Sequence, residues 1–186
     1  MKDMGGIMSM LPSQNPGFSN WTKVFVRYCD GSSFSGNAAE ASAANQLWYR
    51  GRPNLNAVVD ELTKRHGLDS ATEVILSGGS AGGLAVYLQL DHVASLLPSG
   101  TRLTGFPDAG YFADLPNTKG EFKYRGSFQG ADPLWNSTAG GGTNLACLTS
   151  VNSSSSWQCL MAQYVVPHLK TPVFVMNAAI DVYQVR

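Results

Sequence analysis

A serine among glycines is the part of this sequence with the clearest chemical meaning. Residues 73–98 read EVILSGGSAGGLAVYLQLDHVASLLP, in which Gly78, Ser80 and Gly82 form a Gly-x-Ser-x-Gly motif between two apolar stretches. A serine on a sharp turn from strand to helix exposes its hydroxyl group for attack on a carbonyl carbon, and small neighbours permit the close backbone approach that this turn needs. The pattern predicts a nucleophile elbow with Ser80 as the nucleophile.

The predicted turn would also create an oxyanion site. The first N–H groups of a helix have no intrahelical acceptor, and they lie at the positive end of the helix dipole. The N–H of Ala81 is therefore the expected first donor to an oxyanion formed at Ser80. A glycine-rich turn that binds phosphate, or that only packs tightly, is the alternative. However, no Gly-Lys-Ser or Gly-Lys-Thr follows the turn, and its spacing does not fit Gly-x-Gly-x-x-Gly.

A catalytic acid is expected downstream of Ser80. A serine hydroxyl becomes a good nucleophile when a histidine accepts its proton and a carboxylate orients that histidine. In α/β-hydrolases the acid and then the histidine follow the serine along the chain. Asp181 comes directly after the strand-like run at residues 172–180, so it would emerge at the carboxyl edge of a sheet and is the predicted acid. No histidine follows Asp181 in this sequence.

The three histidines of the chain leave the general base open. His66 precedes a glycine at the end of a predicted helix, His92 lies on the segment after the turn, and His168 precedes a strand-like run. Each position has a plain structural explanation, such as the favourable interaction of a partly cationic ring with the carboxyl end of a helix. The set Ser80, Asp108 and His168 remains the second choice for a triad within these residues.

The elements that would position these residues alternate between strand and helix patterns. Runs of β-branched and aromatic residues predict strands, and apolar residues at helical spacing predict helices. The predicted strands cover residues 23–28, 73–76, 102–106 and 172–176, and the predicted helices run from Asn54 as a possible cap to Gly67, and from the turn to Pro98. This order favours an α/β fold with a mainly parallel sheet flanked by helices. Residues 117–142, rich in Gly, Ser and Asn, are expected to form a surface excursion.

Composition narrows the functional classes. With 186 residues the chain has the size of one domain. Thirteen basic and thirteen acidic side chains cancel, so the charge does not suggest a nucleic-acid partner. The sequence has no run of about eighteen apolar residues that would predict a membrane span. Its first residues lack the apolar core and cleavage site of a signal peptide, so no export signal is expected within this chain.

The cysteines and the glycosylation motifs agree with an oxidising, extracellular environment. Cys147 and Cys159 bracket a segment rich in Ser and Asn, and a disulfide between them would restrain this segment. Cys29 would then have no partner within the chain. Free thiols in a cytosolic protein are the alternative. Three Asn-x-Ser/Thr motifs are candidate glycosylation sites, at Asn20, Asn136 and Asn152.

Several strings resemble the pectin acetylesterase and Notum family. They follow the order and spacing of that family over nearly the whole chain, from about residue 6 to residue 184. The string YCDGSSF is much more specific than Gly-x-Ser-x-Gly. The strings are PSQNP at residues 12–16, VRYCDGSSFSG at 26–36, SGGSAGG at 77–83, DAGYF at 108–112 and TPVF at 171–174.

The resemblance implies an α/β-hydrolase-like carboxylesterase, secreted to the extracellular space or the cell wall, with a Ser-Asp-His triad and no metal or cofactor. Ser80 matches the nucleophile of the family and Asp181 matches its acid. The Gly-Gly-Gly-Trp-Cys segment that contributes to the oxyanion hole of the family lies upstream of the first match, and the catalytic histidine lies downstream of the last. We therefore expect residues 1–186 to form a single partial domain that is incomplete at both ends. Cys29 fits a disulfide to an upstream cysteine of the family.

The expected activity is hydrolysis of an acyl ester, with acetylated pectin or a related polysaccharide as substrate. The plant-like YCDGSSF string favours pectin over the lipidated signalling proteins that Notum serves. We expect the chain by itself to have little activity, because the base and part of the oxyanion site are missing. A noncatalytic glycan-binding or interaction module on a hydrolase scaffold is the alternative class, which exposed side chains at Trp135, Trp157 and Tyr124 would support.

Overall fold

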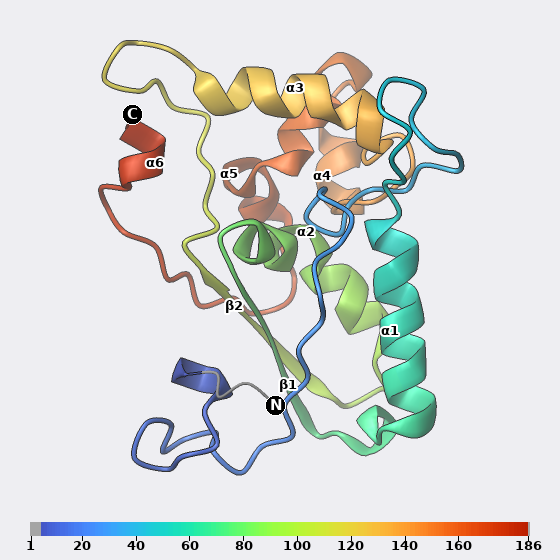
Figure 1. Cartoon of the computed structure of the whole chain (residues 1–186), viewed down its shortest axis with the longest axis vertical. Coiled ribbons are helices and arrows are strands. Elements are labelled where there is room, and N and C mark those ends of the chain that lie inside the picture. Colours follow the sequence, from blue (N-terminus) through green and yellow to red (C-terminus); the bar gives the residue numbers. More distant parts are fainter. Residues whose placement is uncertain (1–4, 186) are drawn as a thin grey trace.

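The computed structural model describes residues 5–185 and forms a mixed α/β fold (Figure 1). Two strands, β1 (Glu73–Gly79) and β2 (Arg102–Asp108), lie parallel and in register from the pair Glu73 and Arg102 to the pair Gly79 and Asp108. The α-helices are α1 (Gly51–Arg65), α2 (Ala81–Leu96), α3 (Lys123–Trp135), α4 (Leu145–Ser150), α5 (Ala162–Val165) and α6 (Val182–Val185). Short 3₁₀ helices cover η1 (Gly6–Met8), η2 (Leu68–Ser70), η3 (Ser153–Leu160) and η4 (Val166–His168).

Residues 172–176 continue the sheet beyond β2. The N–H of Phe174 donates to the Gly105 carbonyl at 2.9 Å, and the N–H of Gly105 donates to the Pro172 carbonyl at 2.8 Å. Parallel bridges join Gly105 to Val173 and Asp108 to Met176. The segment therefore lies parallel to β2. All three predicted interior strands thus run in the same direction, as expected for strands joined by helical connections.

Helix α2 packs against the sheet and forms the centre of the hydrophobic core. Its residues from Gly83 to Leu90 are all buried, which confirms the prediction of a helix that is apolar on most faces. One side of α2 contacts α1 and β2 through Val86, Leu90 and Leu103. Its other side contacts the segment around α5 through Tyr87, Leu88 and Met161. No helix within residues 5–185 is long and apolar enough to cross a membrane.

Helix α1 begins earlier than its sequence pattern predicts. The prediction placed Asn54 as the cap, but the helix starts at Gly51 and its cap residue is Arg50. Pro53 lies in the first turn, where its fixed φ suits a helix and its missing N–H costs no hydrogen bond. The carboxyl end agrees with the prediction, because the helix ends at Arg65 and Gly67 adopts a left-handed φ of 78°.

The predicted strand at residues 23–28 is wrong. The segment joins no strand, and residues 22–31 make no main-chain hydrogen bond to any part of the chain that the structure describes. Val24, Phe25 and Val26 give the run high β-propensity, yet a strand also needs a neighbour that accepts and donates its main-chain hydrogen bonds.

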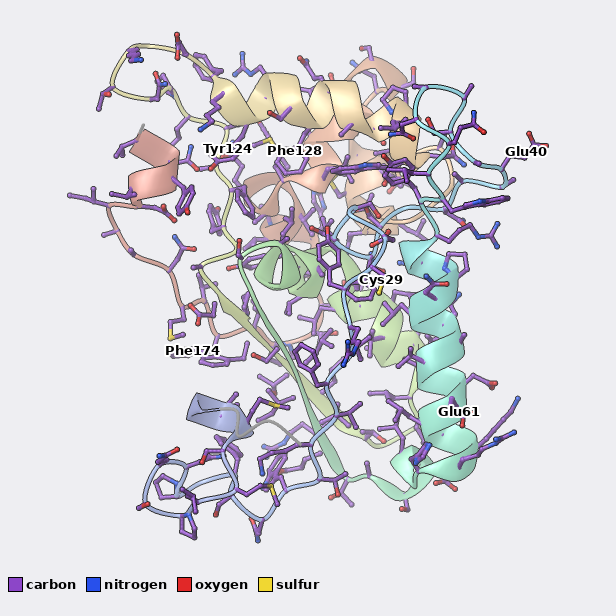
Figure 2. The ribbon with its side chains drawn as sticks, viewed as in Figure 1. Cys29, Glu40, Glu61, Tyr124, Phe128 and Phe174 are labelled. Carbon is purple, nitrogen blue, oxygen red and sulfur yellow. A yellow bond between two sulfur atoms is a disulfide. The ribbon has the colours of Figure 1, made fainter. Side chains whose placement is uncertain are left out.

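The predicted surface excursion at residues 117–142 contains helix α3. Gly126, Gly130 and Pro133 disguise the helical pattern of this segment. Tertiary packing stabilises the helix despite these residues of low helix propensity, because Phe128 is buried in the core and Trp135 packs against it. Figure 2 shows Tyr124 and Phe128 directed from α3 into the packed interior.

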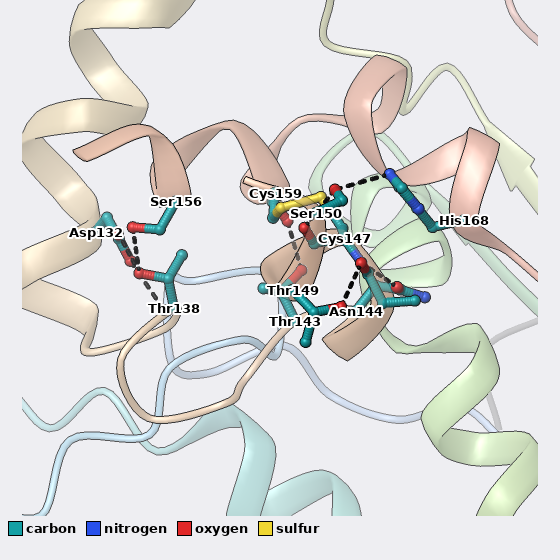
Figure 3. The surroundings of a disulfide bond; sticks show 11 residues. Asp132, Thr138, Thr143, Asn144, Cys147, Thr149, Ser150, Ser156, Cys159 and His168 are labelled. Carbon is teal, nitrogen blue, oxygen red and sulfur yellow. Dashed lines mark hydrogen bonds between the residues drawn. A yellow bond between two sulfur atoms is a disulfide. The ribbon is translucent and has the colours of Figure 1, made fainter. Parts of the chain in front are cut away.

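The predicted disulfide between Cys147 and Cys159 is present. It joins α4 to η3, and both sulfur-bearing residues are fully buried (Figure 3). The Asn144 side chain accepts the Cys147 N–H at 3.0 Å and so caps α4. Cys29 is an exposed free thiol within residues 5–185.

We expect Gly83→Ala to lower the free energy of unfolding by about 1–3 kcal/mol, because the new methyl group would overpack rigid backbone. A Cβ atom at this position would lie 2.7 Å from the Asp108 carbonyl oxygen and 2.9 Å from the Gly110 Cα atom. Gly82→Ala is the matched control, since a Cβ at Gly82 meets nothing within 4 Å. Urea unfolding followed by circular dichroism measures both variants, and equal midpoints would contradict the prediction.

Candidate active site

Ser80 forms the whole turn between β1 and α2. The strand ends at Gly79 and the helix begins at Ala81. Ser80 has φ 54° and ψ −118°, a combination that is strained for any residue with a Cβ atom. Its N–H donates to the Asp108 carbonyl at 2.9 Å, and its own carbonyl accepts the Leu84 N–H at 2.9 Å. The strand, sharp turn and helix that the motif predicts are therefore present.

Gly78, two residues before Ser80, lies where a side chain would collide with the backbone of α2. A Cβ atom at Gly78 would lie 2.5 Å from the carbonyl oxygen of Gly82, on the first turn of α2. The glycine thus allows β1 and α2 to approach each other closely enough for a single residue to connect them.

The Ser80 side chain is accessible. The residue is exposed, and its hydroxyl group makes no hydrogen bond to any described residue, including the capping bond that a serine at this position often makes. It lies at the border of an open cavity of about 1110 Å³, which is also lined by Phe25, Phe106 and Asp108. An ester carbonyl can therefore reach the hydroxyl group from this cavity.

The Ala81 N–H is positioned to stabilise negative charge. Ala81 is the first residue of α2, and its N–H has no main-chain acceptor among the described residues. The 16 residues of α2 add a dipole whose positive end lies at this N–H group. The geometry is consistent with the predicted donor to an oxyanion.

The structure brings Asp108 to Ser80 but places His168 elsewhere. Asp108 ends β2, is exposed and lines the same cavity as Ser80. His168 ends η4, and its Nε2 atom lies 3.1 Å from the Ser150 hydroxyl near the disulfide (Figure 3). It is not among the residues that line the Ser80 cavity. The second-choice triad is therefore not assembled in this structure.

Asp181 lies at the amino end of α6. Its carboxylate accepts the Tyr183 N–H at 2.7 Å, in the manner of a helix cap. Burial and the nearby negative charge of Asp181 raise the pKa of Tyr124. Asp181 does not line the Ser80 cavity.

The segment with Asp181 is held against the chain that follows β2. Gln184 exchanges two side-chain hydrogen bonds with the main chain of Ala113, each at 3.0 Å. Gln184 therefore fixes where the predicted acid can lie relative to the end of β2. The resemblance extends to residue 184, but periodicity gave no signal for this contact.

No described histidine lines the Ser80 cavity. His92 lies on α2, with its Nε2 atom 2.6 Å from the Asn56 side-chain oxygen. Burial and the positive charge of Arg52 lower the pKa of His92 to about 4, so its ring is neutral at pH 7. His66 caps the carboxyl end of α1. No group of three or more His, Cys, Asp or Glu side chains within residues 5–185 is arranged to hold a metal ion.

The YCDGSSF string forms a compact turn that reaches the cavity. The Asp30 carboxylate accepts hydrogen bonds from the N–H and hydroxyl of Ser32, and the Tyr28 hydroxyl accepts the Ser33 N–H at 2.9 Å. These bonds hold Tyr28 and Phe34, which both line the Ser80 cavity. Only the resemblance pointed to this turn, since its hydrogen bonds leave no periodic pattern in the sequence.

The aromatic side chains that would support a glycan-binding platform are not exposed. Trp135, Trp157 and Tyr124 are all half-buried and pack against the core. The Trp157 and Tyr164 rings pack edge-on with their centroids 6.4 Å apart, and the centroids of the Tyr124 and Phe112 rings are 5.2 Å apart. Their placement indicates a role in packing.

Comparison with known proteins shows similarity to the pectin acetylesterase and Notum family along the whole chain. The family model described as "PAE: Pectinacetylesterase" matches residues 1–186. "Pectin acetylesterase 7" of Arabidopsis thaliana is 38% identical over 100% of this chain and 46% of its own length. "Palmitoleoyl-protein carboxylesterase NOTUM" of Drosophila melanogaster is 31% identical over 100% of this chain and 28% of its own length.

A solved structure shares the fold. The Wnt deacylase Notum from Drosophila superposes with a TM-score of 0.87 and 30% identity, over 99% of this chain and 54% of that chain. The chain thus spans less than half the length of these curated relatives and about half of the solved structure.

We expect Ser80→Gly to raise the free energy of unfolding by about 1 kcal/mol, because glycine relieves the backbone strain at a cost in unfolded-state entropy. Ser80→Ala is the control, since it removes the hydroxyl group but keeps the strained Cβ. The Ser80 hydroxyl makes no capping bond, so Ser80→Ala should change stability little. Urea unfolding of the three proteins measures the difference. Glycine and alanine variants of equal stability would show that the turn is unstrained.

Proposed function

Because the chain belongs to the pectinacetylesterase family, a family of serine carboxylesterases, we propose that it forms the nucleophile-bearing part of an enzyme that hydrolyses acyl esters through an acyl-Ser80 intermediate. Residues 1–186 would belong to one α/β-hydrolase-like domain. The observation that carries the proposal is the exposed Ser80 on a strained turn, at the border of an open cavity. This is the position from which a serine attacks a carbonyl group in such folds.

The proposed reaction begins with attack of the Ser80 Oγ atom on the ester carbonyl carbon. The carbonyl electrons move to oxygen, and the Ala81 N–H donates a hydrogen bond to that oxyanion. Collapse releases the alcohol of the substrate and leaves the acyl group on Ser80; water then hydrolyses this ester and restores the serine. A histidine must take the serine proton and pass it to the leaving alcohol. We place this histidine in polypeptide outside residues 1–186, oriented by Asp181.

We propose an acetylated pectin or a related polysaccharide as the substrate. The identity of 38% with a plant pectin acetylesterase, against 31% with the Drosophila NOTUM protein, supports this choice. Deacylation of a lipidated protein is the second candidate, because the fold superposes closely on a Wnt deacylase. Extracellular or cell-wall localisation accompanies both proposals, and Asn20, Asn136 and Asn152 remain proposed glycosylation sites. The packing of Trp135 and Trp157 removes the observation that would have favoured a noncatalytic glycan-binding module.

We expect the isolated chain to show no Ser80-dependent turnover of p-nitrophenyl acetate, since loss of triad members costs up to about six orders of magnitude in turnover. The assay compares the chain with Ser80→Ala at equal concentration. Turnover at ordinary enzyme rates that disappears in Ser80→Ala would contradict this prediction. His168→Ala would then test the second-choice triad.

We expect a chimaera to regain activity when residues 1–186 replace the matched region of Arabidopsis pectin acetylesterase 7. The chimaera should release acetate from acetylated pectin, and Ser80→Ala or Asp181→Asn should lower turnover by roughly four to six orders of magnitude. Ser77→Ala is the control, because the Ser77 hydroxyl only donates to the Phe106 carbonyl at 2.9 Å. A folded chimaera that keeps its activity with Ser80→Ala would disprove the proposed nucleophile. Faster hydrolysis of p-nitrophenyl palmitate than of the acetate would favour lipid deacylation.

A further inference from the structure

The segment that carries Asp181 is held at two points. Before Asp181, the Asn177 side-chain oxygen accepts the Tyr111 N–H at 3.1 Å. After it, Gln184 exchanges two hydrogen bonds with the main chain of Ala113. The residues between Asn177 and Asp181 donate no hydrogen bond to any described residue. The position of the predicted acid therefore depends on the chain that follows β2, because both anchors come from it.

Helix α6 has little apolar packing of its own. None of its residues is buried, and Tyr183 is 73% exposed. Two further hydrogen bonds hold the helix: the Thr118 N–H donates to the Val185 carbonyl at 3.1 Å, and the Tyr124 hydroxyl donates to the Tyr183 carbonyl at 3.2 Å. Hydrogen bonds from residues 113–124 therefore place α6, which lies beside this part of the chain (Figure 1).

A buried ion pair fixes residues 113–124 to the core. The Asp114 side chain is 2% exposed. Its carboxylate accepts hydrogen bonds from the Nε and Nη2 atoms of Arg125 on α3, at 2.9–3.2 Å, and from the Tyr164 hydroxyl on α5, at 2.8 Å. The Asp114 N–H donates to the Gln163 side-chain oxygen at 2.7 Å. Asp114 thus ties this part of the chain to two helices at once.

The proposed reaction does not use this buried charge. Asp114 does not line the Ser80 cavity. Burial of a carboxylate costs free energy, and apolar residues of similar volume often stabilise a fold as well as a buried ion pair does. What the pair with Arg125 adds is direction, because a planar guanidinium meets a carboxylate in a fixed geometry. The main chain beside Asp114 is therefore held in one position.

We propose that Asp114 is a positioning residue for Asp181, the acid of the proposed triad. The ion pair fixes the main chain at the neighbouring Ala113, which receives the Gln184 side chain. Within α6 the Gln184 N–H donates to the Asp181 carbonyl at 3.0 Å, so the position of Gln184 sets that of the acid. The inference rests on the proposed function, since Asp181 has this role only in an esterase.

A role in stability alone is the alternative. Arg125 and Tyr164 belong to different helices, so loss of the Asp114 carboxylate also weakens the packing between them. A purely structural Asp114 would affect how much enzyme is folded but not the kcat of the folded enzyme. A positioning residue lowers kcat of the folded enzyme and leaves KM unchanged, because it does not touch the substrate.

Hydrogen exchange in the isolated chain tests the docking of α6 without any catalysis. Asparagine has one acceptor oxygen where the carboxylate has two, so Asp114→Asn should loosen the segment. We expect the Ala113 and Thr118 amides, whose acceptors lie on α6, to exchange about tenfold faster in this variant. Asp132→Asn is the matched control, since the Asp132 carboxylate is also buried but accepts only Thr138 groups. Unchanged exchange in Asp114→Asn, or the same increase in Asp132→Asn, would contradict the proposal.

Kinetics of the chimaera with Arabidopsis pectin acetylesterase 7 test the effect on the acid. We expect Asp114→Asn to lower kcat for acetate release about ten- to a hundredfold at unchanged KM, because a small displacement of a catalytic group costs this much. Gln184→Met removes the link to Ala113 and leaves the ion pair intact, so it should lower kcat by a similar factor. The double variant should lose no more than the larger single loss, since both changes act on one path. Asp132→Asn should keep the kcat of the parent chimaera.

The outcomes separate this inference from the proposed function. A chimaera that keeps its activity with Asp181→Asn would contradict the proposed acid and this inference together. Loss of activity with Asp181→Asn but an unchanged kcat in folded Asp114→Asn would overturn this inference alone. Losses that multiply in the double variant would also overturn it. Gln184→Met decides the question if Asp114→Asn does not fold, because an unchanged kcat in Gln184→Met shows that the acid needs no such anchor.

Discussion

The close approach of α2 to the loop after β2 is the constraint on which the candidate site depends. Gly83 on α2 packs directly against Gly110, so that any side chain at either position would collide with backbone. This contact brings the start of α2 to the end of β2, where the Asp108 carbonyl accepts the Ser80 N–H. A strained backbone persists only when its surroundings determine it fully. At Ser80 the determinants are a hydrogen bond to the neighbouring strand and a helix that begins at the next residue.

Burial of α2 on nearly all sides makes this constraint rigid. The helix joins the two halves of the core, since Val86 and Leu90 contact α1 while Tyr87 and Leu88 contact the segment around α5. Asp91, near its end, accepts the main-chain N–H groups of Lys170 and Thr171, which lead into the third strand. The same helix therefore positions the serine turn at its beginning and sets the path of the chain toward residues 172–176 at its end.

Elements of the fold could be predicted from the sequence where the local residue pattern agrees with the final packing. The turn at Ser80, the strands around it and the end of α1 shortly before Gly67 each depend on residues close in the chain, so motif and periodicity were enough to predict them. Helix α3 was missed because its stability comes from Phe128 and distant core residues, whereas its local sequence contains two glycines and a proline. The opposite failure occurred at residues 23–28, whose strand propensity is high but whose main chain has no partner within the described residues. Propensity describes how a segment fits into a sheet, and it does not say whether a neighbouring strand is present.

The difference between local and long-range contacts also explains why this fold can position a nucleophile without assembling a complete catalytic site. The geometry of Ser80 is fixed by contacts within the stretch of sequence from β1 to Gly110, so it can form without the rest of a catalytic site. Proton transfer needs a histidine within hydrogen-bond reach of the serine, and among the described residues none lines its cavity. Asp181 is held by Gln184 and its own helix cap, and these bonds do not involve Ser80. The turn prepares the hydroxyl group and the first oxyanion donor, while the base and the alignment of the acid depend on groups that come together over longer range.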